Sequence, residues 1–354
     1  MSRTERLLVI PLCISLFVSL FLLTLSACDS ESKENPLQER PAMAAQSTDT
    51  KTYCIGRHLI DLPVDFELSG NNETFRPEKS DVKTEEKIEA SQLGNGVTVA
   101  EFKSQVAKRR IEILAQQHMY LNTPMLAHEE SLNDHSVLLR SYESIDSDKN
   151  AFRSELHVLV GDVHAVLTTV SYEASFAAAE QRLLAFSRRL EQVNPDVKTG
   201  SGFCFGSLLV KGQLDKEAAE LSFHNKKHPD LVLNISVDTY AKNDKETLLQ
   251  RVSGSGLLGT FNVAHTVLRK GDITVAGMKA QEWLAWTELG DDKHKQHAFS
   301  LETIRPVPSP DHPLLGIELE TGQQGPNGDE QKASLSDKDA VAMWDGIVRT
   351  IRLR

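Results

Sequence analysis

Apolar and polar positions divide the chain into an apolar leader, a polar stretch and a long body of short alternating runs. Residues 7–23 are almost entirely apolar and follow Arg3 and Arg6. Residues 29–52 carry scarcely any large apolar side chain, which is typical of a disordered segment. The pattern therefore predicts a leader over residues 1–27, a tether over residues 28–52 and a folded body that begins at residue 53.

Within the body, the first half shows the periods of both strands and helices. Alternation and apolar runs predict strands over residues 97–102, 136–143, 152–160 and 163–172. Apolar positions at helical spacing predict a helix over residues 103–117. Gly161-Asp162 fits a two-residue hairpin turn between the last two strands. A closing amphipathic helix carries Phe176, Leu183, Phe186 and Leu190.

The second half repeats this order. A half-buried strand is predicted over residues 231–238, followed by a helix for which Asn243 is the expected N-cap. A hairpin with Gly271-Asp272 at its turn is expected next, over residues 261–275. Further strands are predicted over residues 278–288, 298–304 and 314–319. Ser336 and Asp339 form a capping box that opens a final helix with Trp344 and Ile347 on its apolar face.

A weak internal repeat accompanies this shared order. Residues 53–60 read YCIGRHLI and residues 203–210 read FCFGSLLV, an offset of 150, while AFRS at residue 151 matches AFS at residue 298, an offset of 147. About 300 residues suggest two domains. We expect an α+β protein formed by internal duplication, with an N-terminal domain over residues 53–195 and a C-terminal domain over 203–354. Each domain would be an antiparallel sheet packed with two helices, and residues 194–202 would link them.

The leader ends in a four-residue motif that indicates how it is processed. Leu25-Ser26-Ala27-Cys28 follows the apolar run, as in a bacterial lipoprotein signal peptide that is cut before an acylated cysteine. Cys28 is therefore the predicted lipidation site and membrane anchor, and an uncleaved transmembrane anchor is the alternative. Asp29 resembles the signal that retains enterobacterial lipoproteins on the inner membrane. The body is expected in the periplasm.

Charge narrows the class of partner. The formal net charge is −11, and without residues 1–27, which carry Arg3, Arg6 and Glu5 for a net +1, it is −12. This acidic balance argues against nucleic acid as a partner. It suits a partner with a basic surface, because complementary fields speed association, although solubility alone also explains it.

Two thiols remain in the body, because Cys13 leaves with the signal peptide and Cys28 is lipidated. In an exported protein, Cys54 and Cys204 suggest one disulfide. Closing a loop of that length would stabilise the fold by about 5 kcal/mol on the chain-entropy model. Two separately buried cysteines are the alternative.

No motif in the sequence predicts catalysis, a cofactor or a metal. Residues 253–256 read SGSG, which is the wrong spacing for a nucleophile elbow, and no phosphate loop or His-Glu-x-x-His occurs. His294 with His297, joined by His224 and His228, lacks the ligand spacing of a zinc site. His157 and His164 flank the Gly161-Asp162 turn and could face each other. Trp283 and Trp286 would point to opposite faces of one strand, one in the core and one exposed.

Short motifs in both halves resemble a known family. Residues 53–63, residues 202–205, the stretch HPDL at 228–231, the helix at 247–249 and residues 277–283 are similar to the immunity proteins that protect bacteria from type VI secreted lipase effectors. The resemblance covers nearly all of residues 53–354. It implies a non-enzymatic protein that binds and inhibits a secreted phospholipase in the periplasm, with no cofactor. Contact residues do not transfer, so we expect contacts in the polar loops at residues 122–134, 290–296, 306–313 and 322–332.

Two other functions remain open from the sequence alone. A periplasmic lipoprotein that binds a small ligand would need a pocket with convergent polar groups. A lipoprotein that serves envelope assembly would instead bind resident envelope proteins. An enzyme is not expected, because the catalytic motifs are missing.

Overall fold

The structure is a computed structural model, and it describes residues 49–77, 87–193, 202–241, 246–253, 265–289, 294–304, 309–310, 312–322 and 331–354. The predicted signal peptide, Cys28 and most of the predicted tether lie outside the described residues. So do Asn243 and most of the predicted linker at 194–202. Within the described ranges, no helix is both long enough and apolar enough to cross a membrane.

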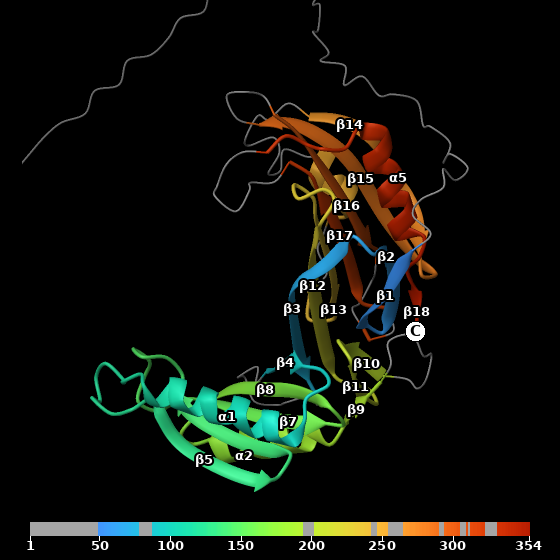
Figure 1. Cartoon of the computed structure of the whole chain (residues 1–354). Helices are drawn as coiled ribbons and strands as arrows, with labels where there is room; N and C mark the ends of the chain where they lie inside the picture. Colours follow the sequence, from blue (N-terminus) through green and yellow to red (C-terminus); the bar gives the residue numbers. More distant parts are fainter. Residues whose placement is uncertain are drawn as a thin grey trace, which may run out of the picture. The chain divides into compact units, whose positions relative to one another are not determined.

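The described part of the chain is mostly β, with four helices (Figure 1). The helices are α1 (Val99–Leu114), α2 (Phe176–Ser187), α3 (Leu248–Ser253) and α5 (Asp337–Val348). The first-half strands are β1 (Thr50–Gly56), β2 (His58–Pro63), β3 (Phe66–Arg76), β4 (Ile88–Gly94), β5 (Leu126–Asn133), β6 (Ser136–Tyr142), β7 (Ala151–Val160), β8 (Val163–Tyr172) and β9 (Leu190–Gln192). The second-half strands are β10 (Gly202–Phe205), β11 (Leu208–Lys211), β12 (Lys216–Asn225), β13 (Val232–Asp238), β14 (His265–Val275), β15 (Met278–Leu289), β16 (His294–Thr303), β17 (Leu314–Glu320) and β18 (Arg352–Leu353).

A six-stranded antiparallel sheet joins the beginnings of the two halves, in the order β18-β2-β1-β10-β11-β9. The sequence repeat lies at its centre, where Ile55 of β1 stands opposite Phe205 of β10. Each repeat unit is a tight hairpin that turns at a glycine, Gly56 with φ +59° and Gly206 with φ +54°. These left-handed conformations favour glycine, because a Cβ atom is crowded there. The letters shared at offset 150 therefore encode two equivalent hairpins.

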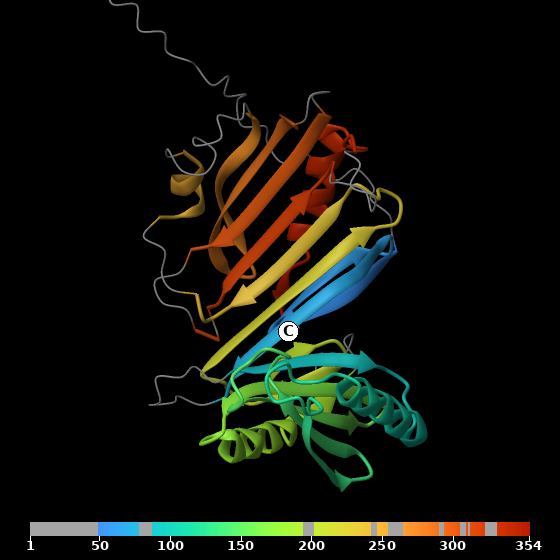
Figure 2. The same cartoon turned by 90° about the vertical axis from the view of Figure 1, so that its left-hand side faces the viewer.

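A twelve-stranded antiparallel sheet also draws on both halves, in the order β14-β15-β16-β17-β13-β12-β3-β4-β8-β7-β6-β5. Its two middle strands, β3 and β12, pair from Arg76 opposite Lys216 to Phe66 opposite Asn225. In Figure 2, β3, β12, β13, β17, β16 and β15 run side by side as one continuous surface. The halves meet through backbone hydrogen bonds along the length of both strands.

The predicted antiparallel sheets are present, but the prediction that each half has a sheet of its own is wrong. Both sheets are shared, and the last strand of each half pairs with the opening hairpin of the other, β9 with β11 and β18 with β2. The strand order of the large sheet reads equivalently from either end. An internal duplication would produce this arrangement, and the duplication itself stays a prediction.

The main apolar core also crosses between the halves. The Phe75 ring in β3 packs against Phe186 of α2 at 5.1 Å and against Phe203 of β10 at 4.9 Å between ring centroids. All three rings are at most 1% exposed. Burying such a side chain contributes about 1.5–3 kcal/mol, so separating the halves would expose apolar surface that each alone cannot cover.

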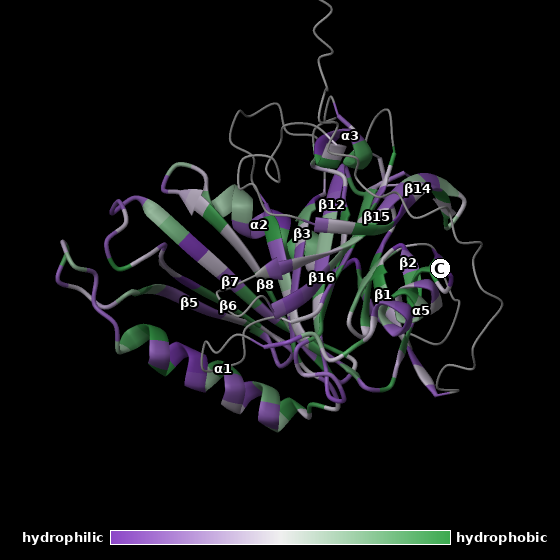
Figure 3. Ribbon diagram, turned by 90° about the horizontal axis from the view of Figure 1, so that it is seen from above, coloured by the Kyte–Doolittle hydropathy of each residue, from purple (hydrophilic) through white to green (hydrophobic). Residues whose placement is uncertain are grey.

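Helices α1 and α2 lie on opposite faces of the first-half strands (Figure 3). On β7, Leu156 and Val158 join the core cluster that contains Phe186 of α2, whereas Leu159 joins a separate cluster with Phe102 of α1. Alternate residues of a strand point to opposite faces, which explains the division. A strand buried on both faces loses the polar alternation that sequence patterns depend on.

Three local predictions are wrong. Leu190, expected on the helix with Phe176, Leu183 and Phe186, instead begins β9, because α2 ends at Ser187. Residues 97–102 do not form a strand, because α1 begins at Val99 with Thr98 as its N-cap and Glu101 completing a capping box. The turn expected at Gly271-Asp272 lies instead at Ala276-Gly277, where both residues have positive φ, and residues 271–272 continue β14. The hairpin turn at Gly161-Asp162 is confirmed, with Gly161 at φ +63°. Ser336 is confirmed as the N-cap of α5.

Candidate partner-binding surface

A chain of polar side chains joins α1 to the sheet, with Glu155, His157 and His164 buried, Arg109 half-buried and Gln105 exposed. Arg109 of α1 donates two hydrogen bonds to Glu155 of β7, at 2.9 and 2.6 Å. His157 Nε2 lies 3.4 Å from Glu155 Oε2, and His157 Nδ1 lies 3.1 Å from His164 Nε2. The other ring nitrogen of His164 is 2.6 Å from Gln105 Oε1. The prediction that the two histidines face each other across the hairpin is confirmed.

The protonation of this cluster follows from its neighbours. Burial alone would raise the pKa of Glu155, but hydrogen bonds from Arg109 and His157 lower that pKa to about 2. Burial, together with the nearby His157 ring, lowers the pKa of His164 to about 4. Glu155 is therefore a carboxylate and His164 a neutral ring at neutral pH, and the Arg109–Glu155 ion pair helps to hold α1 on the sheet.

A small cavity of about 260 Å³ lies beside the cluster. Its lining includes Leu93, Val166 and Thr168 together with the five polar residues. Thr168 is the one hydroxyl in that lining, and the carboxylate and guanidinium are already paired to each other. The groups around this cavity support the packing of α1.

A second buried ionic cluster fixes α5 in the other half. Arg269 of β14 lies 2.9 Å from Glu282 of β15 and 2.6 Å from Asp345 of α5. The indole N–H of Trp344 donates to Glu282 at 3.1 Å. Both acids satisfy the same guanidinium, which avoids the cost of an unpaired buried charge. This cluster also holds a helix on the sheet.

Three of the four histidines weighed as metal ligands contact other partners. Buried His297 contacts Thr321 at 2.7 Å and Asp337 at 2.8 Å, whereas His228 contacts Ser334 at 2.8 Å and His224 lies 3.3 Å from Glu67. Among the residues that the structure describes, no three His, Cys, Asp or Glu side chains gather as a metal site would require.

The two tryptophans of β15 occupy opposite faces, as predicted. Trp283 is 6% exposed and packs in a small cluster with Leu248 of α3. Trp286 is half-buried, and the Lys295 ammonium lies 4.2 Å from its ring centroid. Neither indole offers the freely exposed anchor that the sequence left open.

The predicted contact loops are partly strand and partly outside the described residues. Within residues 122–134, Leu126–Asn133 form β5, the edge of the large sheet, and not a loop. Residues 290–293, 306–308, 311 and 323–330, which make up much of the other three segments, lie outside the described residues. A groove of about 570 Å³ runs between α1 and β5 and is lined by the ion pairs Lys103–Asp134 and Arg110–Glu129.

The most exposed apolar side chains of the described residues lie beyond the C-terminal end of α1. Tyr120 is 72% exposed and Met119 is 64% exposed, and neighbouring Ile145, in the loop between β6 and β7, is 46% exposed. We refer to Met119, Tyr120 and Ile145 as the apolar tip. Sequence reasoning missed it, because the three-residue run Met119-Tyr120-Leu121 and the single Ile145 are too short to carry a periodic signal.

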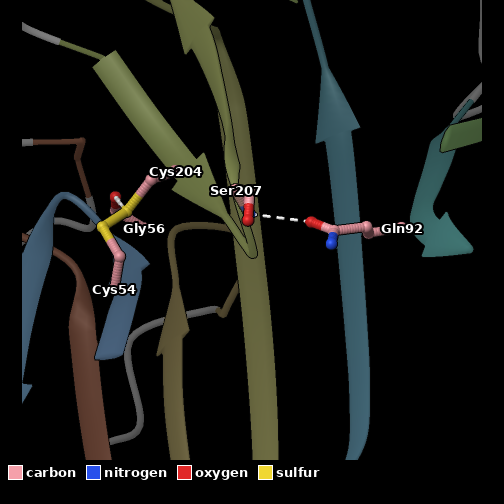
Figure 4. The surroundings of a disulfide bond; sticks show 5 residues. All are labelled: Cys54, Gly56, Gln92, Cys204 and Ser207. Atoms are coloured by element: carbon pink, nitrogen blue, oxygen red, sulfur yellow. Dashed lines mark hydrogen bonds between the residues drawn. A yellow bond between two sulfur atoms is a disulfide. The ribbon is translucent and has the colours of Figure 1, made fainter. Parts of the chain in front are cut away.

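Cys54 and Cys204 form a disulfide between β1 and β10, with Cα atoms 6.0 Å apart (Figure 4). Both cysteines are buried with Leu59 and Leu209. Beside them, the Gly206-Ser207 turn is held by Gln92 of β4, whose side-chain oxygen accepts the Ser207 N–H at 2.7 Å. The disulfide therefore links the two halves at the hairpins that form the sequence repeat.

Two models of a known protein family match this chain. Residues 51–198 match the model of the Tle cognate immunity protein 4 N-terminal domain, and residues 196–354 match that of the C-terminal domain. Among curated proteins, no sequence matches the chain.

Solved structures share the fold. An apo immunity protein TplEi of the type VI secretion system (T6SS) from Pseudomonas aeruginosa is 24% identical with a TM-score of 0.64, covering 86% of this chain and 97% of that one. A Tle4–Tli4 complex contains a chain that is 23% identical with a TM-score of 0.66, covering 88% and 99%. A TplEi structure from the same organism bound to an "L" peptide is 22% identical with a TM-score of 0.62, covering 87% and 99%. Since the two family models together span the described body from end to end, this chain belongs to the Tle cognate immunity protein 4 family.

Proposed function

We propose that this chain binds and inhibits a phospholipase effector of a type VI secretion system in the periplasm, and so protects the cell from its own kin. The observation that carries the proposal is the match of both immunity-protein domain models, in order, over residues 51–354. A structural neighbour was solved in a complex named Tle4–Tli4, which supports a protein partner for this fold.

The charged clusters and the rigid scaffold of the described residues suit a protein that binds a partner. Arg109–Glu155 and Arg269–Glu282–Asp345 are paired internally and fix helices on the sheet. The shared sheets and the disulfide join the two halves into a scaffold with little freedom to rearrange, which lowers the entropy lost when a partner binds. Inhibition then requires only that the bound chain cover the mouth of the lipase active site. We expect a nanomolar 1:1 complex that buries more than about 1,600 Å².

The proposed location follows from the leader. Cleavage before Cys28, acylation of its thiol and retention by Asp29 would hold the body at the periplasmic face of the inner membrane. Each buried methylene of an acyl chain contributes about 0.8 kcal/mol, so several chains anchor the protein firmly. Metabolic labelling with palmitate should mark the wild-type chain and not a Cys28→Ala variant. Equal labelling of both would contradict lipidation at this residue.

A survival assay tests the function. Cells that export the cognate lipase to the periplasm should die unless they also express this chain. A chain without residues 1–27, which stays in the cytoplasm, should give no protection and is the matched control. Equal survival with and without the full chain would contradict the proposal, and so would phospholipid hydrolysis by the purified chain alone.

A further inference from the structure

The backbone of the apolar tip is held by hydrogen bonds to a buried histidine side chain. His118, 1% exposed, lies beneath it, and its Nδ1 accepts the N–H groups of Tyr120 and Leu121, each at 3.3 Å. Its Nε2 lies 3.1 Å from the carbonyl oxygen of Ser147. These contacts fit one neutral tautomer, in which Nε2 carries the proton and donates it to that carbonyl oxygen.

The backbone of the two loops is also joined directly. The Met119 N–H donates to the Ile145 carbonyl oxygen at 2.7 Å, and the Asn122 N–H donates to the His118 carbonyl oxygen at 3.0 Å. The His118 ring packs edge-on against Tyr142 at 4.8 Å between centroids. The exposed side chains of the tip are therefore presented on a backbone that is already fixed. In Figure 1 these loops lie at the left-hand end of α1.

Solvent exposure of such side chains has no benefit for the fold. Tyrosine and methionine are enriched at the centres of protein interfaces, where a few large side chains carry most of the binding free energy. A fixed backbone also reduces the entropy lost when those side chains are buried by a partner. Three such residues on two joined loops therefore indicate a contact surface.

The charges around the tip define its partner. The loop that carries Ile145 also exposes three acids, Glu143, Asp146 and Asp148. Glu173 is exposed as well, and its N–H donates a hydrogen bond to the Asn150 carbonyl oxygen at the end of that loop. Lys149 is the one cation among residues 143–150. An apolar surface framed by acids is repelled by anionic lipid headgroups and complements a protein surface with basic residues around an apolar recess.

We propose that the apolar tip inserts into an apolar recess, rimmed by lysine or arginine, on the surface of the effector. The inference rests on the proposed function and adds the surface that makes the contact and the chemistry of the surface that receives it. The acidic frame speeds the encounter and makes it dependent on salt, whereas Tyr120 and Met119 supply most of the affinity.

Calorimetric titration of the full exported chain with the cognate lipase tests this assignment. The Met119→Ala/Tyr120→Ala double variant should weaken binding at least thirtyfold. The matched control is Leu353→Ala in β18, which removes a side chain that is 58% exposed in the other sheet, and it should change affinity less than twofold. Circular dichroism should show both variants folded, because the substituted side chains are largely exposed.

Charge reversal tests the partner's chemistry separately. Wild-type binding should weaken as NaCl is raised from 50 to 500 mM, and a Glu143→Lys/Asp146→Lys/Asp148→Lys variant should lose both affinity and this salt dependence. If the wild-type chain binds the lipase and the tip substitutions change the affinity by less than twofold, the inference is overturned and the proposed function stays intact. Absence of wild-type binding would overturn both. Binding of the tip to vesicles of phosphatidylethanolamine and phosphatidylglycerol, lost in the double variant, would assign the surface to lipid and overturn it as well.

Discussion

Replacing both Cys54 and Cys204 with serine tests whether the two halves are one cooperative unit. The disulfide closes a loop with a sequence separation of 150 residues, for which the chain-entropy model gives about 5 kcal/mol of stabilisation. A serine hydroxyl at position 204 would stand where the sulfur now lies 3.0 Å from the Gly56 carbonyl oxygen, and its hydrogen bond would restore about 1 kcal/mol. We therefore expect a loss of about 4 kcal/mol in the free energy of unfolding.

Urea unfolding of the exported chain, followed by two probes, gives both the loss and the cooperativity. All three tryptophans, Trp283, Trp286 and Trp344, lie in the second half, so fluorescence reports on that half while far-ultraviolet circular dichroism reports on both. Because the sheets and the core are shared, the two probes should give one coincident transition in wild type and variant. Wild-type protein with reductant is the control for the substitution itself and should lose about 5 kcal/mol, because it lacks the serine hydrogen bond.

Two results would refute this reasoning. A loss below about 1 kcal/mol would mean that the disulfide does not restrict the unfolded chain as the model assumes. Separate fluorescence and dichroism transitions would mean that the halves unfold independently, against the shared sheets.

Three substitutions at buried charged groups give further predictions, each read by urea unfolding. Burial raises the pKa of Glu73 from its usual 4.5 to about 7, so the contribution of Glu73 to the free energy of unfolding is present below pH 4.5 and is lost as pH rises through 7. Relative to wild type, Glu73→Gln should therefore stabilise the fold by up to about 3 kcal/mol at pH 8 and by nothing at pH 4.5. Burial and the Arg57 charge lower the pKa of His58 to about 4. As pH falls below 6.5, the unfolded wild-type chain therefore binds a proton at His58 that the folded chain does not, which destabilises the fold. The free energy of unfolding of His58→Leu relative to wild type should rise by up to about 3 kcal/mol between pH 7.5 and 4. Arg57→Met should cost about 3–5 kcal/mol by leaving Glu217 buried without its 2.6 Å partner, and Arg57→Met/Glu217→Met should recover most of it. A pH-independent effect of either of the first two changes, or no recovery in the double variant, would contradict the corresponding assignment.

Sequence patterns predicted the outer elements of each half and missed its centre. The hairpin of β7 and β8 has a clear turn signal, α5 has a clear cap signal, and α2 has helical periodicity without a cap. Strand β3 contains Ser69-Gly70-Asn71-Asn72-Glu73, whose residue types are poor strand formers, and β12 begins with Lys216-Glu217-Ala218-Ala219-Glu220, which favours a helix. Their pairing with each other, over a separation that no local pattern encodes, overrides both preferences.

The start of α1 carried a signal that hydrophobic alternation concealed. Val97 and Val99 alternate with Thr98 as in a strand, but Thr98 and Glu101 form the capping box that places a helix start there. Neither the polar cluster beneath α1 nor the apolar tip carried such a signal in the sequence. His157 and His164 could be paired from the turn between them, whereas the contribution of Arg109 and Gln105 depends on how α1 docks. The apolar tip depends on a buried His118 that the sequence presents as an ordinary loop residue.

The central claim, that this chain acts by binding a lipase, is tested most directly by titrating the purified exported chain into its cognate phospholipase while heat and hydrolysis are measured together. The account predicts a nanomolar complex at a 1:1 ratio, with phospholipid hydrolysis falling in proportion to the fraction bound and reaching the background rate at equivalence. No heat of binding, with hydrolysis undiminished at an excess of this chain, would contradict it.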